Sequence, residues 1–104
     1  MIEGKVSRGT SEEASLLEIT VHDYFMHYNR LHIPSEIRES FPIIGTRFAL
    51  ETDAGIINTK MEKGGQIWEG MGRWFKSHTD LMIGDKLAIK IIEQMKRYRL
   101  EIAK

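Results

Sequence analysis

The stretch "GRWFKSHTDLMIGDKLAIKI", Gly72 to Ile91, decides the fold of this chain. It places two large aromatic residues, Trp74 and Phe75, ahead of a Gly84-Asp85 pair, after which apolar residues alternate with polar or small ones. Alternation with a period of two indicates a strand with one buried face, and a Gly-Asp pair is typical of a turn. We expect Gly70 to Ser77 to form a short helix whose two aromatic side chains fill the core. The segment is therefore interpreted as scaffold.

The C-terminal end of the chain fits two structures. Leu87, Ile89 and Ile91 alternate, residues 93–96 turn the chain, and alternation resumes at residue 98, which predicts a hairpin. Residues 87, 91, 95, 98 and 102 also trace a helical stripe, and the local propensities favour a helix. We favour the hairpin. Its apolar residues are expected in one core with those of other segments, namely Phe48, Trp74, Phe75, Leu87, Ile89, Leu100 and Ile102.

The first half of the chain shows short strand signals separated by turns. Leu16 to Val21 is apolar and β-branched, which predicts a strand, and Arg30 to Ile33 is a candidate for a second short extended piece. His22 to Pro34 fits no clean helical stripe. Pro34 and Glu36 mark the start of a short helix that stops before Pro42.

The middle of the chain predicts a hairpin. Arg47 to Asp53 alternates, Asp53-Ala54-Gly55 has turn chemistry, and Ile56 to Met61 is a plausible return strand. A second turn at Lys63 to Gln66 follows. These elements together predict a mainly β fold with two short helices, a small open barrel of mostly antiparallel strands.

Length and composition bound the classes of protein. A chain of 104 residues suits one domain, expected over residues 16–104, after a polar arm or loop at residues 1–15. The absence of cysteine excludes disulfides and thiolate chemistry within this chain. No run approaches the ~20 apolar residues of a membrane span. We expect a soluble cytoplasmic protein.

The net charge is zero, with 15 basic and 15 acidic residues, which disfavours a general polyanion binder. The charge is unevenly distributed along the chain. Residues 1–59 carry 5 Lys and Arg against 9 Asp and Glu, whereas residues 60–104 carry 10 against 6. A basic face can therefore exist on a neutral protein, although solvated surface positions explain the same counts.

The order of these elements resembles the DNA-binding pseudobarrel family, the fold of plant B-three transcription-factor domains and of recognition domains in some type II restriction endonucleases. The plant domains have Gly-Trp, two residues, Phe, and then a Leu ahead of a Gly-Asp pair. Here "GRWF", Leu81 and Gly84-Asp85 match this pattern loosely. The resemblance extends from about Leu16 over nearly the whole chain.

The resemblance implies that two arms grip duplex DNA in the major groove. The first arm corresponds to His22 to Arg30 and the second to Asn58 to Gln66. Amide and guanidinium groups in these arms can pair with base edges, whereas cations and hydroxyl or imidazole groups can meet phosphates and sugars. Solvated loop residues remain the simpler explanation for each one. The candidate DNA contacts are Tyr24, His27, Tyr28, Asn29, Arg30, Asn58, Lys60, Lys63 and Gln66.

Enzyme signatures are weak in this sequence. His22, His27 and His32 recur every five residues, a spacing that separates side chains around a helix and places them on opposite faces of a strand. We therefore expect no metal site and no cofactor. No phosphate-binding loop, nucleophile elbow or acid–base pair is recognisable. The chain is predicted not to be an enzyme, although it could be the recognition part of a nuclease.

Three functions stay open at this point. The first is a module that reads duplex DNA, as a regulator or as a restriction-nuclease recognition domain. The second is a small barrel that binds RNA or a protein partner through the same loops. The third is a small-molecule or catalytic barrel, which would need an enclosed cavity with convergent polar groups. The sequence leaves the oligomeric state and the recognised bases open.

Overall fold

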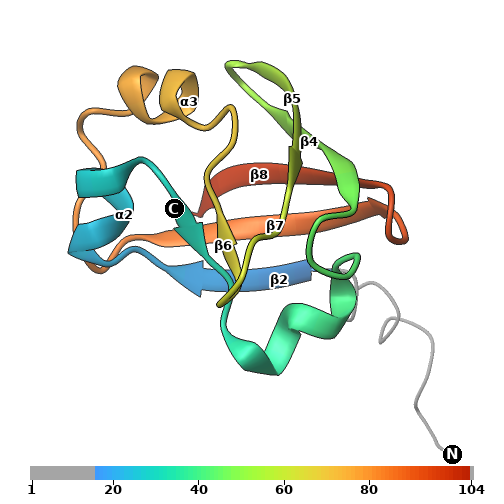
Figure 1. Ribbon diagram of the computed structural model, residues 1–104. Helices are drawn as coiled ribbons and strands as arrows, with labels where there is room; N and C mark the ends of the chain where they lie inside the picture. Colours follow the sequence, from blue (N-terminus) through green and yellow to red (C-terminus); the bar gives the residue numbers. More distant parts are fainter. Residues whose placement is uncertain (1–15, 104) are drawn as a thin grey trace, which may run out of the picture.

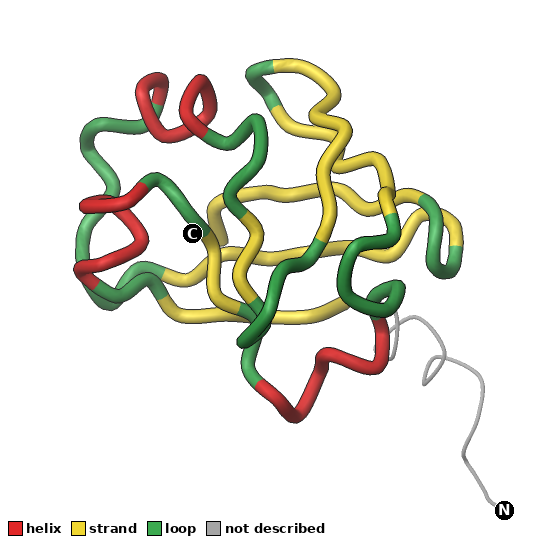
Figure 2. The backbone as a smooth tube through the Cα atoms, in the orientation of Figure 1, coloured by secondary structure: helices red, strands yellow, loops and turns green. Residues whose placement is uncertain are grey.

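A computed structural model describes residues 16–103 and contains two sheets (Figures 1 and 2). The larger sheet has five strands in the order β2-β7-β8-β4-β5, and the smaller one pairs β3 with β6. All pairs are antiparallel except β4 with β8. The strands are β2 (Leu16–Thr20), β3 (Leu31–His32), β4 (Arg47–Thr52), β5 (Gly55–Lys60), β6 (Gln66–Ile67), β7 (Lys86–Glu93) and β8 (Arg97–Ala103). The expected mainly β, open pseudobarrel is confirmed, and the expected arm at residues 1–15 lies outside the described residues.

The C-terminal hairpin is confirmed, and the alternative helix is excluded. β7 and β8 pair along their length, from Lys86 with Ala103 to Glu93 with Arg97. Gly84 has φ +95°, and the Asp85 carboxylate accepts a hydrogen bond of 2.9 Å from the backbone N–H of Met82. This turn explains why the chain enters β7 where the sequence predicted it. The middle hairpin of β4 and β5 is also confirmed, from Arg47 with Lys60 to Thr52 with Gly55.

Within residues 16–103, three short helices join the strands: α2 (Asp23–Tyr28), the 3-10 helix η1 (Ser35–Ser40) and α3 (Gly72–Ser77). The sequence predicted η1 and α3 but not α2, because His22 to Pro34 shows no clean helical stripe. Phe25, at 1% exposure, anchors α2 to the core, and Asn29 ends it in the left-handed conformation. A helix of six residues is too short to display a repeated apolar stripe.

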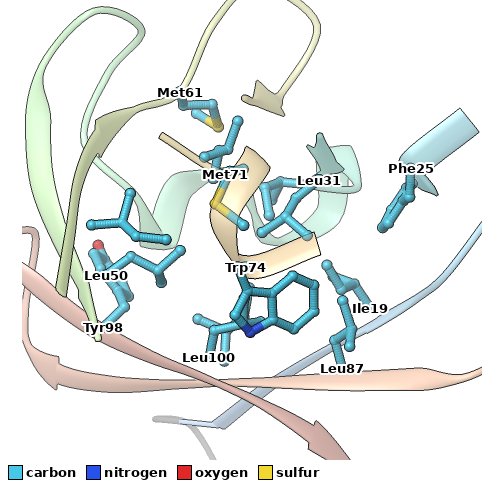
Figure 3. Packing of buried hydrophobic residues seen from close by; sticks show 14 of the residues in the cluster. Ile19, Phe25, Leu31, Leu50, Met61, Met71, Trp74, Leu87, Tyr98 and Leu100 are labelled. Atoms are coloured by element: carbon cyan, nitrogen blue, oxygen red, sulfur yellow. The ribbon is translucent and has the colours of Figure 1, made fainter. Parts of the chain in front are cut away.

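One apolar core fills the space between the two sheets (Figure 3). Trp74 from α3 is 1% exposed, and its ring meets Phe75 edge-on at 5.0 Å. Tyr98 from β8 stacks on Phe41 at 4.7 Å, and its hydroxyl donates a 2.6 Å hydrogen bond to the Ser40 carbonyl. All seven predicted core residues belong to this cluster, six of them buried and Ile102 partly buried. The scaffold role of α3 is therefore confirmed.

Candidate nucleic-acid interface

The small sheet joins the ends of the two predicted arms. In it, Leu31 pairs with Ile67 and His32 with Gln66. The first arm leads directly into β3, and the second arm ends in β6. We call residues 30–33 together with residues 64–67 the arm root. The ends of two segments that lie more than 30 residues apart in sequence are thereby side by side.

Arg30 and Gln66, two predicted DNA-binding residues, contact each other within the arm root. Nη1 of Arg30 donates a hydrogen bond to Oε1 of Gln66. The guanidinium carbon of Arg30 lies 5.2 Å from the centre of the Tyr28 ring, in a cation–π arrangement. Within residues 16–103, the buried Nε of Arg30 has no hydrogen-bond partner. A base contact by Arg30 or Gln66 must therefore share or break the hydrogen bond between them.

Arg38, from η1, holds the second arm and was not among the predicted residues. Its Nε donates to the Ile33 carbonyl at 2.8 Å, and its Nη2 donates to the Gly64 carbonyl at 2.9 Å. The same Nη2 lies 3.3 Å from Nε2 of His32. No sequence signal marks this role, because Arg38 is 26 residues from Gly64.

The turn of the second arm depends on two glycines in the left-handed conformation. Gly64 and Gly65 both have φ +80°. The Gly65 N–H donates to the Glu62 carbonyl at 3.0 Å, and its carbonyl accepts from the Ile33 N–H at 2.8 Å. A Cβ atom on Gly65 would lie 2.6 Å from the Ile33 carbonyl oxygen, whereas one on Gly64 would meet nothing closer than 3.9 Å. The lack of a side chain is therefore required by close packing at Gly65 and not at Gly64.

The cations of the second arm differ in their surroundings. Nζ of Lys60 lies 3.7 Å from a Glu62 oxygen and 3.9 Å from a Glu69 oxygen, and its side chain is 29% exposed. Lys63 is exposed and, within the described residues, forms no ion pair. Lys63 is therefore more available to an incoming phosphate than Lys60.

Asn58 lies on the outward side of the middle hairpin and belongs to a separate polar group. Its side-chain oxygen accepts a 3.2 Å hydrogen bond from Nη1 of Arg47. Nη2 of Arg47 is 2.7 Å from a Glu69 oxygen, which also approaches Lys60 through the other carboxylate oxygen. Arg47 is half exposed and is another cation near the second arm that the sequence did not single out.

The first arm presents a helix followed by a left-handed residue. His27 and Tyr28 are exposed on α2, with ring centres 4.6 Å apart. Tyr28 is 57% exposed, and Asn29 is exposed at φ +56°. Tyr24 lies on the same helix by its backbone. The first arm therefore offers one aromatic, one imidazole and one amide group to solvent beside the arm root.

The pKa of His32 is lowered from its ordinary value of 6.5, first by burial and then by the positive charge of Arg38. The backbone of Gly64 opposes this shift, and His22 adds to it. The neutral imidazole is thus the favoured form at the arm root. A ring nitrogen of neutral His32 can then accept from the Arg38 guanidinium.

The histidine spacing considered above does not produce a metal cluster in residues 16–103. No group of three or more His, Asp or Glu side chains there could hold a metal ion. Within the same residues, no helix has the length and apolar character needed to cross a membrane.

Three solved structures share this fold. The N-terminal domain of Helicobacter pylori LlaJI.R1 has a TM-score of 0.67 and 18% identity, covering 86% of this chain and 87% of that one. The Arabidopsis FUS3–DNA complex has a TM-score of 0.63 and 15% sequence identity, covering 85% of this chain and 95% of that one. A hypothetical Arabidopsis thaliana protein has a TM-score of 0.58 and 16% sequence identity, covering 85% of this chain and 88% of that one.

These likenesses confirm, at the level of the fold, the resemblance to the DNA-binding pseudobarrels. No family model and no curated protein matches the sequence. The fold is thus recognised from its three-dimensional structure, because the sequence identities to the three structures are only 15–18%.

Proposed function

We propose that this domain reads duplex DNA through its two arms in the major groove, as part of a regulator or as the recognition part of a restriction nuclease. The observation that carries the proposal is the arm root, where β3 pairs with β6 and Arg30 bonds Gln66. This pairing positions two otherwise separate polar segments to approach one ligand together. A neighbour of the same fold was solved as a complex with DNA, which supports this choice of ligand.

In this proposal the arms divide the work between phosphates and bases. Lys63 is exposed on the second arm and meets the backbone. Asn29, exposed at the end of α2, can pair with an adenine edge through its amide. Arg30 and Gln66 fix the spacing of the arms, and the guanidinium keeps further N–H groups for DNA. No enzymatic role is assigned to these residues.

The phosphate part of the proposal can be tested with labelled random duplex at two salt concentrations. In Lys63→Ala, losing one phosphate contact should lower the slope of log K against log salt by about 0.9. Lys96→Ala is the matched control, because Lys96 is 74% exposed but lies in the turn between β7 and β8. An identical slope for the two variants, or no salt-dependent duplex binding by the unaltered protein, would contradict the proposal.

The base-reading part needs a variant that keeps the backbone unchanged. Asn29→Gly removes the amide while retaining the left-handed conformation without strain. It should weaken binding to a selected preferred site by ~1–3 kcal/mol while leaving binding to random duplex nearly unaffected. Preferred sites would come from selection on a random duplex library. Equal losses of affinity for both duplexes would show that Asn29 does not read a base. Tighter binding of the protein to structured RNA than to duplex DNA would favour the alternative of an RNA-binding barrel.

A further inference from the structure

A groove of about 760 Å³ opens at the tip of the middle hairpin, away from the arm root. It lies where β4 and β8 separate: their parallel pairing ends at Glu51 with Arg99, while β8 continues to Ala103. Figure 1 shows the β4–β5 tip beside α3 at the top of the molecule, whereas the loop between β5 and β6 lies lower in the view. We call this feature the hairpin-tip groove.

The floor of the hairpin-tip groove is apolar and is formed by scaffold residues. Trp74 and Leu100 are buried at its base, Ile102 is partly buried, and Ile56 is 61% exposed at its side. At one end, Nε2 of His78 contacts a carboxylate oxygen of Asp53 at 2.9 Å, which links α3 to the hairpin tip. The groove is thus a formed feature with an apolar base and a polar margin.

One wall of the groove is the edge of β8. From Leu100 to Ala103, β8 pairs with β7 on one side, and within residues 16–103 no strand pairs with its other edge. An unpaired edge presents backbone N–H and C=O groups that can bind an added strand. Four residues at ~3.3 Å each span about 13 Å, enough for a short extended peptide.

The margin of the groove is acidic. Four carboxylates line it, those of Glu51, Asp53, Asp80 and Glu101, against one arginine and one histidine. Arg97 and Arg99 bind Glu51, and His78 binds Asp53. Among the described residues, Asp80 and Glu101 are exposed and form no ion pair. This margin repels a nucleic acid backbone and attracts cations.

We propose that the hairpin-tip groove binds an extended peptide segment of a partner protein in which basic and apolar residues alternate. The peptide adds as a strand to the edge of β8. Its apolar side chains point to Ile102 and Trp74, and its basic side chains point to Asp80 and Glu101. Strand addition supplies affinity through the main chain, and the acidic margin selects the sequence. This surface is separate from the proposed DNA interface, so either can fail without the other.

The test uses the peptide acetyl-Lys-Val-Lys-Val-Lys-amide, followed by amide NMR shifts of the intact chain. Binding should shift the amides of residues 100–103 and of Gly55 and Ile56, and leave those of the arm root unchanged. The same peptide with Glu for Lys should not bind. A version N-methylated at alternate backbone nitrogens should bind much more weakly, because it cannot complete a strand. Equal binding of either control peptide would overturn the proposal.

Variants of the protein separate charge from apolar contact. Asp80→Asn with Glu101→Gln should weaken binding of the lysine peptide about 5-fold, since exposed ion pairs are individually weak. Glu36→Gln with Glu39→Gln is the matched control on η1, where both residues are exposed. Ile102→Ala should also weaken binding, because Ile102 is partly buried at the apolar floor of the groove, and circular dichroism checks that the fold is kept. Shifts confined to residues 61–66, or equal affinity of both double variants, would overturn the assignment to this groove.

Discussion

The core of this domain is held by apolar packing, whereas the arm root adds directional hydrogen bonds to that packing. In the core, Trp74 and Tyr98 are at most 1% exposed and contact other large apolar side chains. In the arm root, Leu31, Ile33 and Ile67 also belong to this core, and its polar contacts between distant segments are hydrogen bonds from Arg30 and Arg38 and a two-residue strand pair. Burial of apolar area is non-directional, whereas these hydrogen bonds fix particular atoms.

This difference separates the stability of the whole domain from the placement of the two arms. Changes in the core should alter the free energy of unfolding of the whole domain. Changes in the arm root should alter the placement of the arms at a smaller cost in stability. The following predictions test this separation, from the largest expected effect to the smallest.

The largest effect is expected for Trp74→Ala. Removing a fully buried indole leaves a cavity between α3 and the sheet, which should cost ~3–5 kcal/mol of unfolding free energy. Chemical denaturation followed by circular dichroism measures this loss. Trp68→Ala is the control, because Trp68 is 46% exposed, and it should cost much less. An unchanged midpoint for Trp74→Ala would contradict the role of α3 in the core.

The next effect is expected for Gly65→Ala in the arm root. The left-handed conformation and the close approach of Cβ to the Ile33 carbonyl should together cost about 2–4 kcal/mol. Gly64→Ala has the same φ but no close contact, so it should cost only the conformational part, ~1–2 kcal/mol. Denaturation midpoints of both variants test the difference. Equal losses would show that packing against Ile33 and Arg38 contributes nothing.

A smaller effect is expected for the contact between Arg30 and Gln66. A double-mutant cycle with Arg30→Ala and Gln66→Ala should give a coupling free energy of about 1 kcal/mol, because the guanidinium is charged and partly buried. The exposed pair Arg47 and Asn58 serves as the comparison and should give a coupling near zero. Similar coupling in both cycles would show that burial at the arm root adds no strength to the contact.

The smallest effect is expected from protonation of His32. Its pKa in the folded protein is lowered, so the unfolded chain takes up the proton first as the pH falls. The stabilising contribution is therefore complete above the ordinary value of 6.5 and is lost as the pH falls through the lower folded value. Amide exchange protection of β3 and β6 should drop as the pH falls below the ordinary value of 6.5, with β7 unaffected.

His32→Gln should remove this pH dependence, because the amide does not titrate in that range. His27→Gln is the control, since His27 is exposed on α2 and outside the small sheet. A pH dependence that persists in His32→Gln would assign the effect to another group.

Much of the fold was predictable because its signals are local. Alternation at Leu87, Ile89 and Leu100 identified the C-terminal hairpin, and Gly84-Asp85 located its preceding turn. α2 was missed, because a six-residue helix anchored by Phe25 carries no periodic pattern. Its conformation depends on a packing contact that only the folded chain supplies.

The candidate site was predictable only as two polar segments. Asn29 and Lys63, both among the predicted DNA contacts, are exposed, and their contact with DNA stays a prediction. The sequence did not reveal that Arg30 bonds Gln66 or that Lys60 lies between Glu62 and Glu69. Such contacts join residues that are related neither by hydrophobic periodicity nor by a regular spacing in the sequence.

The sequence by itself predicted most of the strands, the main turns and part of the core, because apolar alternation and turn chemistry act over a few neighbouring residues. The tertiary structure alone decided that the two arms share one root, that Arg38 secures the second arm, and that β4 and β8 separate to leave a groove. These features follow from strand pairing between distant segments, whose partners are selected by the packing of the whole core.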